Sequence, residues 1–208
     1  MADHVRKLIL DGTLAPSHKL NPAELAVELG VSHTPAREAL QLLASEGLVR
    51  NTAYRGAFVA ELSADEYEEI FLMRIGLEPL AAKLGAERID DGGIAEARRC
   101  FTELEEAARS GDTDRFIDAD RGFHEAHYLA SGRKPLWERI IGLRVAAERY
   151  IRVGYGIPSV DMTDTVRSHR GLMLAIEQRD GELAKAITST DLTRTFNAVY
   201  EQLTRRGG

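Results

Sequence analysis

The chain has 208 residues, 44% of them hydrophobic, which is enough for one small and one medium domain with separate cores. The formal net charge is −6, and the single cysteine, Cys100, excludes an internal disulfide and suits a reducing cytoplasm. No apolar run approaches the length of a membrane span and no signal-peptide pattern is present, so we expect a cytoplasmic protein without a membrane partner.

Residues 20–59 have the pattern of a helix-turn-helix followed by a β-hairpin wing. Gly30 suits the left-handed end of a first helix, and Ser32 can cap a second helix that has Pro35 in its first turn. Apolar residues recur along this second helix at i, i+4 and i+7 and predict its buried stripe: Ala36, Leu40 and Leu43. Residues 54–59 are predicted to form the return strand of the wing.

A polar row on the second helix indicates a nucleic-acid partner. His33, Arg37 and Gln41 share one helical face, and a helix of this kind can enter a major groove. The same periodicity occurs in helical proteins that bind no DNA. The predicted two-strand wing favours the DNA-binding interpretation, because it carries Arg50 and Arg55 and contributes little to a hydrophobic core. Residues 1–60 hold six basic and six acidic side chains, so the remainder carries the whole negative charge.

The runs GVSHTPAREALQLLASEGLV and RGAFV resemble the winged helix-turn-helix of the GntR family of bacterial transcriptional regulators. The resemblance implies that Thr34 and Arg37 contact double-stranded operator DNA and that Gly56 lies close to its backbone. His33 stands where the family usually has arginine, and a neutral imidazole cannot make the bidentate guanidinium contact to guanine. The predicted DNA-binding residues are His33, Thr34, Arg37, Gln41, Arg55 and Gly56.

From residue 63 onward, strand patterns vanish and about six helices are separated by short breaks. Ser63 can cap the first of them, with Glu66 completing a capping box, and this helix is predicted to end near Arg88. Later breaks are predicted near residues 90–93, 110–112, 131–135, 154–158 and 180–181. We therefore predict a mainly α protein, with a winged helix-turn-helix over residues 1–62 and an all-α antiparallel bundle over residues 63–208.

Four residues of the predicted bundle have the chemistry of a metal site. Asp120 and His124 are four apart on the third helix and so face the same way, while His169 and Asp191 fall on the last two helices. Facing helices of a bundle commonly assemble metal sites from inward-pointing carboxylates and imidazoles. The spacing alone fits equally a surface Asp–His hydrogen bond and a structural histidine.

The helical part resembles the effector-binding (FCD) domain of the FadR-type branch of GntR regulators, in its VanR-like six-helix form. Asp120 and His124 match its D-x-x-x-H metal motif, and His169 matches the next histidine, whereas Asp191 stands where the family places another histidine. The resemblance implies a divalent metal held by these four residues. Zinc is the first choice, and manganese, nickel and magnesium are the alternatives. The carboxylate ligands shift the preference toward the harder ions, manganese and magnesium. His127, one helical turn beyond His124, could act as a substitute ligand, but we favour a place at the surface or behind the ligands.

A small organic acid is the effector that the resemblance implies, bound near the metal by nearby cations. Arg74 and Glu78 match the domain's R-x-x-x-E element, and Arg144 on the fourth helix is the first-ranked anion partner. Arg149 and Arg152 on the same helix are further candidates, for which a solvated surface position is the alternative. Because one recognition helix reads only a few base pairs, we predict a homodimer.

Two other functions are compatible with parts of the sequence. A metal-dependent hydrolase would use the same four ligands to activate water, but it leaves residues 1–60 without a role and the chain without an evident nucleophile. A helical partner-binding module explains the bundle and leaves the wing unexplained. The prediction is therefore a non-enzymatic transcriptional regulator.

Overall fold

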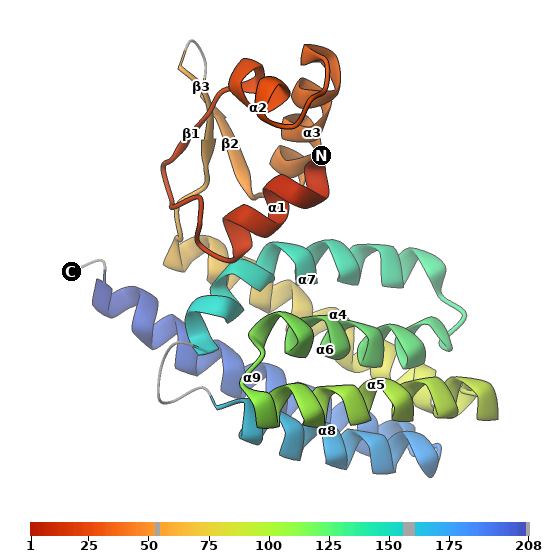
Figure 1. Ribbon diagram of the computed structural model, residues 1–208. Helices are drawn as coiled ribbons and strands as arrows, with labels where there is room; N and C mark the ends of the chain where they lie inside the picture. The colour runs from red at the N-terminus through yellow and green to blue at the C-terminus, as the bar shows by residue number, and fades with distance from the viewer. Residues whose placement is uncertain (53–54, 156–160, 207–208) are drawn as a thin grey trace.

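The computed structural model describes residues 1–52, 55–155 and 161–206, with two parts stacked one above the other (Figure 1). The N-terminal part packs three helices against a small sheet: α1 (Ala2–Leu10), α2 (Pro22–Glu28), α3 (His33–Ser45), β1 (Lys19–Leu20), β2 (Val49–Thr52) and β3 (Gly56–Val59). The sheet is antiparallel, in the order β1-β3-β2.

The predicted two-strand wing is wrong in one respect, because β1 adds a third strand. Lys19 lies opposite Phe58, and Leu20 lies opposite Ala57, so β3 is central rather than at an edge. Of the predicted return strand, Tyr54 lies outside the described residues, and β3 begins at Gly56. The third strand ties the base of the wing to the segment that precedes α2.

The turn between α2 and α3 has the geometry that its sequence predicts. Gly30 adopts a φ of +64°, and the Val31 amide donates to the Ala26 carbonyl at 3.0 Å, which closes the end of α2. Ser32 occupies the N-cap position of α3, although its side chain makes no capping hydrogen bond. The turn therefore sets the angle at which α3 leaves α2.

The N-terminal core is built on the predicted apolar stripe of α3. Ala36, Leu40 and Leu43 are all buried. Leu40 and Leu43 pack among apolar residues from every other element of this part: Val5, Ile9, Leu20, Leu25, Leu48, Val49 and Val59. Burial of each leucine contributes about 1.5–3 kcal/mol. Because this face of α3 is fixed inward, the polar row on the opposite face is held toward solvent.

The six predicted bundle helices are present in the described residues. They are α4 (Ala64–Arg88), α5 (Asp91–Ser110), α6 (Thr113–Leu129), α7 (Lys134–Tyr155), α8 (Met162–Glu177) and α9 (Gly181–Arg206). Asp90, Asp112 and Asp161 cap α5, α6 and α8 through their side chains. The loop predicted at residues 154–158 begins later, because α7 continues through Tyr155, and residues 156–160 lie outside the described part.

The helix start at Ser63 differs from a full capping box. Ser63 Oγ accepts a hydrogen bond from the Glu66 amide at 3.3 Å, as predicted. The Glu66 carboxylate does not return to Ser63; it accepts hydrogen bonds from Arg149 at 2.5 Å and Tyr150 at 2.7 Å. The first turn of α4 is thereby joined to α7.

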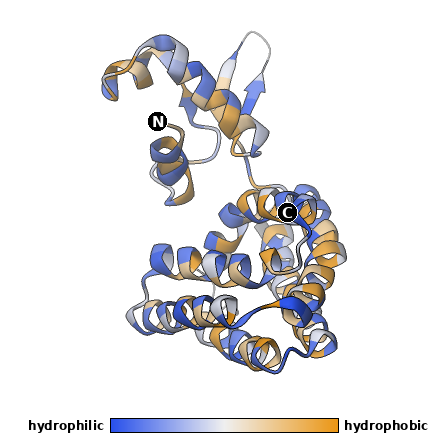
Figure 2. Cartoon of the chain, turned by 90° about the vertical axis from the view of Figure 1, so that its right-hand side faces the viewer, coloured by the Kyte–Doolittle hydropathy of each residue, from blue (hydrophilic) through white to orange (hydrophobic). Residues whose placement is uncertain are grey.

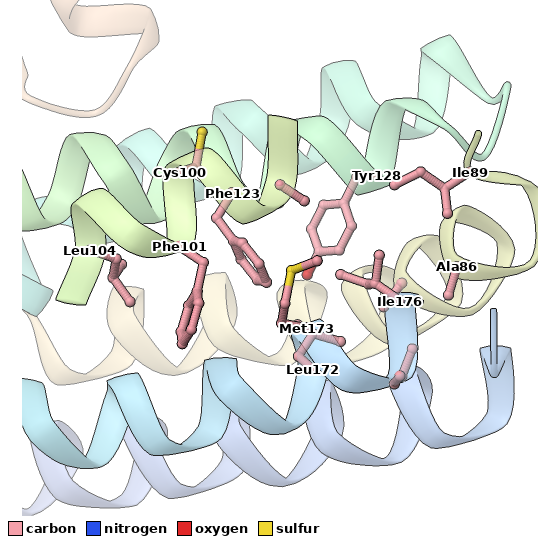
Figure 3. Close-up of a cluster of buried hydrophobic side chains, with 14 of the residues drawn as sticks. Ala86, Ile89, Cys100, Phe101, Leu104, Phe123, Tyr128, Leu172, Met173 and Ile176 are labelled. Atoms are coloured by element: carbon pink, nitrogen blue, oxygen red, sulfur yellow. The ribbon is translucent and has the colours of Figure 1, made fainter. Parts of the chain in front are cut away.

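The main core of the bundle lies between α4, α5, α6 and α8 (Figure 3). Phe101 and Phe123 pack with their ring centroids 6.1 Å apart, and Cys100, next to Phe101 on α5, is 2% exposed. Figure 2 shows hydrophobic and hydrophilic segments alternating along the helices of the bundle. Among the described residues, no helix has the length and hydropathy needed to cross a membrane.

Candidate functional site

The predicted DNA-reading residues lie together on the outer side of the N-terminal part. His33, Thr34, Arg37 and Gln41 are all exposed along α3. Arg55 and Gly56 are exposed at the start of β3, where Gly56 has a φ of +98° that a residue with a side chain rarely adopts. The exposed face of α3 and the turn end of the β2–β3 wing are therefore the two surfaces predicted to contact a groove and the adjoining backbone.

Three of the four predicted metal ligands converge between α6 and α8. His169 Nε2 lies 2.8 Å from Asp120 Oδ1 and 3.0 Å from His124 Nε2, and the remaining His124–Asp120 separation is 3.6 Å. Two donors bound tetrahedrally with metal bonds of about 2.0–2.1 Å stand about 3.3 Å apart. The triangle of donor atoms therefore has the dimensions that a small divalent ion requires.

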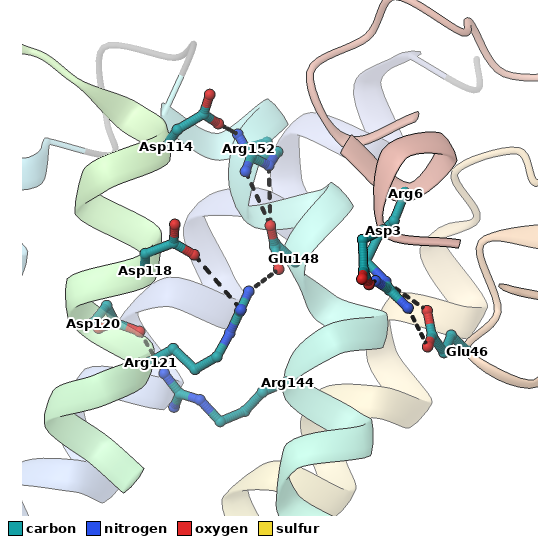
Figure 4. Close-up of polar contacts among 10 residues, drawn as sticks. All are labelled: Asp3, Arg6, Glu46, Asp114, Asp118, Asp120, Arg121, Arg144, Glu148 and Arg152. Carbon is teal, nitrogen blue, oxygen red and sulfur yellow. Dashed lines mark hydrogen bonds and ion pairs between the residues drawn. The ribbon is translucent and has the colours of Figure 1, made fainter. Parts of the chain in front are cut away.

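The groups around this triangle fix its orientation. His169 Nδ1 donates to the Thr165 carbonyl at 2.9 Å, so the lone pair of Nε2 faces the other donors. Asp120 divides its two oxygens, with Oδ1 toward the histidines and Oδ2 hydrogen-bonded to Arg144 (Figure 4). His124 Nδ1 is buried without a hydrogen-bond partner among the described residues. Hydrogen bonds to Arg144 and to the Thr165 carbonyl therefore hold Asp120 and His169 in place before any ion is added.

The pKa shifts of Asp120 and His124 favour metal binding, whereas that of His169 opposes it. Burial, with the charge of Arg144 next, lowers the pKa of His124 to about 4. Burial would raise the pKa of Asp120, but Arg144 and His124 hold that pKa well below its ordinary value. Burial opposes protonation of His169, yet the hydrogen bond and charge of Asp120 raise its pKa. Near neutral pH, Asp120 is an anion and His124 is a neutral imidazole, which are the forms that coordinate metals.

Asp191 is not brought into the triangle. Among the described residues, the donor atoms that lie within 4.8 Å of one another belong to Asp120, His124 and His169. Asp191 lines the same cavity from α9, but its carboxylate accepts a hydrogen bond from Arg194 at 2.6 Å. An aspartate has a shorter reach than the histidine that the family pattern places there. A fourth ligand from Asp191 remains a prediction that requires this ion pair to open.

Of the two positions expected for His127, the one at the surface is excluded and the one behind the ligands is found. Its side chain is fully buried, and Nδ1 lies 3.0 Å from the Phe123 carbonyl oxygen. The backbone of His127 packs against α4 so closely that a Cβ at Gly85 would stand 2.0 Å from the His127 carbonyl oxygen. Burial holds the pKa of His127 well below its ordinary value. His127 belongs to the helix contact behind the ligands.

The two predicted effector-binding arginines are bound to a buried carboxylate. Glu78, only 1% exposed, accepts hydrogen bonds from Arg74 at 2.5 Å, Arg144 at 2.8 Å and Tyr128 at 3.1 Å. Burial opposes the charge on Glu78, but the two arginines lower its pKa to about 2. Arg74 and Arg144 do line the cavity. Their charge is largely balanced by Glu78 and Asp120.

Arg121 is a cavity cation that the sequence analysis did not select. Its side chain is 38% exposed, and it donates to Glu148 at 2.7 Å, while Arg152 holds the other oxygen of Glu148 (Figure 4). Its position next to Asp120 in the sequence, on the helix that carries the metal motif, could have identified Arg121 as a residue near the site. Arg149 is also not a solvated surface residue, because it is 7% exposed and donates to the Gly47 carbonyl at 2.7 Å.

The cavity that contains these groups is small and mixed in chemistry, with a volume of about 90 Å³. One wall carries the metal-ligand triangle and the arginines. Hydroxyl groups and apolar side chains complete the lining: Thr165, Ser168, Thr188, Thr195, Ile117, Ile151, Leu172, Ile187 and Leu192. An apolar cavity with a few convergent polar groups is the usual form of a small-molecule site.

A winged helix-turn-helix joined to a helical domain with an internal cavity is the architecture of a two-domain transcriptional regulator. Two family models match the chain: "Bacterial regulatory proteins, gntR family" over residues 1–59 and "FCD domain" over residues 69–194. The protein belongs to the GntR family of regulators and carries an FCD domain.

Individual relatives agree with this assignment. The chain is 27% identical to the HTH-type transcriptional regulator McbR of Escherichia coli over 201 residues, covering 93% of this chain and 88% of McbR. The solved structure of McbR superposes with a TM-score of 0.82 at 25% identity, covering 97% of this chain and 95% of that one. The uncharacterized regulator YdhC of Bacillus subtilis is 33% identical over 124 residues, 59% of this chain and 55% of YdhC. The predicted fold class is confirmed, and so is the prediction of a regulator rather than a hydrolase.

Proposed function

We propose that this regulator binds operator DNA as a homodimer and that a small organic acid, bound beside a divalent metal in the FCD domain, controls its DNA affinity. The observation that carries the proposal is the convergence of Asp120, His124 and His169 in a cavity lined by cations. A metal at this point would be the largest local charge in the cavity, and it would attract an anionic ligand.

The donor set supports a divalent metal with room for a ligand. Two imidazoles and one carboxylate leave one or more coordination positions free, and zinc, manganese, nickel and magnesium are the candidate ions. A carboxylate of the effector can occupy a free position. If Asp191 opens its ion pair with Arg194, its carboxylate competes for the same position.

The charges around the cavity support a specific arrangement of the effector. All three cavity arginines, Arg74, Arg144 and Arg121, are paired with carboxylates, but Arg121 is 38% exposed and is therefore the better partner for a second anionic or polar group. The hydroxyl groups of Thr165 and Ser168 can hydrogen-bond to hydroxyl substituents. We therefore favour a small hydroxy acid or dicarboxylate.

Helix α7 supports a physical connection between the cavity and the DNA-binding part. Arg144 and Glu148 line the cavity, whereas the next residue, Arg149, donates to the carbonyl of Gly47 just beyond the end of α3. Arg149 also holds Glu66 at the start of α4. A ligand that moves α7 would therefore also move the contact between Arg149 and the end of α3, the recognition helix. Allosteric coupling between two sites typically amounts to about 1–3 kcal/mol.

We expect Arg37→Ala to weaken specific operator binding by about 1–3 kcal/mol, because an arginine that contacts a base edge contributes both affinity and discrimination. Fluorescence anisotropy with a duplex from the region upstream of the gene, and with a shuffled duplex, measures both quantities. Arg99→Ala is the matched control, since it removes an exposed arginine on α5 that lies outside the DNA-reading face.

The anisotropy assay also decides the DNA-binding part of the proposal. Arg99→Ala should keep both the affinity and the preference of the unmodified protein. If the unmodified protein does not prefer its upstream region over the shuffled duplex at moderate salt, the proposal of sequence-specific operator binding is wrong. If Arg37→Ala retains full preference, α3 does not read bases through Arg37.

A further inference from the structure

A second cavity, separate from the metal-ligand triangle, lies between the DNA-binding part and the bundle, where α1 lies beside α7 (Figure 1). Four segments line it: the end of α1 with the residues that follow it, the linker from β3 to α4, the turn from α5 to α6, and α7. This interdomain cleft has a volume of about 590 Å³. Small-molecule sites usually measure about 300–1,000 Å³ and often lie at domain interfaces. The interdomain cleft therefore has the size and the location of a ligand site.

Apolar side chains from both parts of the protein line the interdomain cleft. Ile9, Leu10 and Val59 are buried in the core of the DNA-binding part, and Leu14 packs against that core. Leu62, from the linker, packs against the core formed by α4, α7 and α9. Because these side chains are held by the two cores, the cleft keeps an apolar wall on which the apolar body of a ligand can pack.

Two carboxylates at the interdomain cleft carry negative charge that no ion pair balances. Asp11, just after α1, accepts a hydrogen bond from the Thr13 amide at 3.0 Å, and Asp112, just before α6, accepts one from the Arg115 amide at 3.0 Å. Neither carboxylate forms an ion pair with a residue in the described part of the chain. Asp11 and Asp112 come from different parts of the protein, so a cation in the cleft would be attracted to both parts.

The two arginines of the interdomain cleft are already paired with carboxylates. Arg152 donates to Asp114 at 2.5 Å and to Glu148 at 3.0 Å (Figure 4). Arg149, which is 7% exposed, donates to Glu66 at 2.5 Å. The Nε of Arg149 is nevertheless buried without a hydrogen-bond partner among the described residues. A buried donor without a partner is rare in folded proteins, and it indicates that this wall of the cleft lacks a hydrogen-bond acceptor.

We propose that the interdomain cleft binds a small organic cation, with an apolar body against the leucines, an ammonium group near Asp11 and Asp112, and a hydrogen-bond acceptor near Arg149. The site is additional to the proposed function, in which an acid binds a different cavity. Its ligand would contact both parts of the protein at once. Through Arg149 it would also touch the hydrogen bond that joins α7 to the Gly47 carbonyl beyond α3.

Phenylalaninol and phenylpropanol are matched probes of the cleft. Both have a phenyl ring and a hydroxyl group, and phenylalaninol adds an amine that is protonated at neutral pH. Isothermal titration calorimetry of the full-length protein gives both affinities without DNA or effector acid. Phenylalaninol should bind about 2- to 30-fold more tightly than phenylpropanol, because its ammonium group is attracted to two exposed carboxylates. Equal affinities, or no binding of phenylalaninol, would overturn the proposal.

Removal of the two carboxylate charges tests the position of the ammonium group. Asp11→Asn/Asp112→Asn changes the shape of the side chains little, and asparagine caps a helix as well as aspartate does. In this variant phenylalaninol should bind no more tightly than phenylpropanol, whose affinity should stay the same. Each single variant should weaken phenylalaninol binding about 1.5- to 5-fold, from one exposed pair. The control is Glu125→Gln/Glu138→Gln, which removes two exposed carboxylates outside the cleft and should bind both probes as the wild type does.

A variant that fills the interdomain cleft tests the location of the whole ligand. Thr113 lies in the lining, and Thr113→Trp should weaken the binding of both probes. Circular dichroism at increasing temperature reports whether this variant is folded, and if it is not, the asparagine variants alone decide. Wild-type binding of both probes by folded Thr113→Trp, or a preference for phenylalaninol that survives in Asp11→Asn/Asp112→Asn, would show that the cleft is not the site.

The supporting result is a preference for phenylalaninol that is lost in Asp11→Asn/Asp112→Asn and kept in Glu125→Gln/Glu138→Gln. These measurements use no operator DNA, so failure of the cleft leaves the proposed regulator standing. Failure of operator binding in the anisotropy assay would likewise leave the cleft to be judged by calorimetry.

Discussion

Glu78→Gln should destabilise the folded protein by about 3–5 kcal/mol, because removing one partner of a buried ion pair leaves charge without compensation. Glu78 is the single carboxylate that balances both Arg74 and Arg144, and it also accepts the hydrogen bond of the Tyr128 hydroxyl. Glutamine has nearly the same shape, so the loss measures charge rather than packing. Urea unfolding at neutral pH gives the difference, with Glu103→Gln, an exposed glutamate paired with Arg99, as the control.

The difference in unfolding free energy between the wild-type protein and Glu78→Gln should also become smaller as the pH falls. The pKa of Glu78 falls from an ordinary 4.5 to about 2 in the folded protein, so its ionisation stabilises the fold above pH 4.5. This contribution, about 3 kcal/mol from the size of the shift, is lost as pH falls from 4.5 toward 2. Both proteins retain the buried histidines, so the difference between them isolates Glu78. A wild-type advantage that stays constant down to pH 2.5 would contradict the assigned charge state.

The double variant His124→Ala/His169→Ala should lose the bound metal. The wild-type protein, purified without chelator, should carry close to one divalent ion per chain, because two of the three converging donors are imidazoles. At a free metal concentration 100 times the dissociation constant, binding stabilises the folded state by about 2.7 kcal/mol, so a chelator should lower the melting temperature of the wild type alone. Elemental analysis and thermal unfolding give both quantities.

The control for metal loss is His18→Ala/His33→Ala, which removes two exposed imidazoles and should keep the ion. Acid should release the metal from the wild type, because protonated histidines cannot coordinate. Equal metal content in the wild type and in His124→Ala/His169→Ala would refute the site, whatever the identity of the ion.

Local patterns were sufficient to predict the elements that local interactions determine. The apolar spacing of Ala36, Leu40 and Leu43 predicted both the recognition helix and its buried face, and Ser63 marked the start of α4. The pair Asp120 and His124 was also predictable, since a spacing of four fixes their common direction on any helix. The three-stranded sheet was missed because β1 is two residues long and gains its partners only from β3.

The parts that sequence reasoning missed depend on contacts between distant segments. Glu78 balances Arg144, which lies 66 positions later in the chain, so no helical spacing predicts the pair. His127 is buried because Gly85 allows α4 to approach its backbone, and this contact is invisible in the pattern of α6 alone. Asp191 was assigned as a ligand by position in the family motif, whereas its neighbour Arg194 binds the carboxylate in the structure.

Operator affinity, measured by anisotropy on metal-loaded protein during titration with small hydroxy acids and dicarboxylates, tests the central claim most directly. The account predicts a 5- to 150-fold change in affinity, which corresponds to about 1–3 kcal/mol of coupling, for an acid that calorimetry shows to bind. Arg149→Ala should bind the same acid equally well, because Arg149 lies outside the cavity lining, and yet transmit a smaller change to the operator. An acid that binds the wild-type cavity tightly and leaves operator affinity unchanged would contradict control of DNA binding through α7.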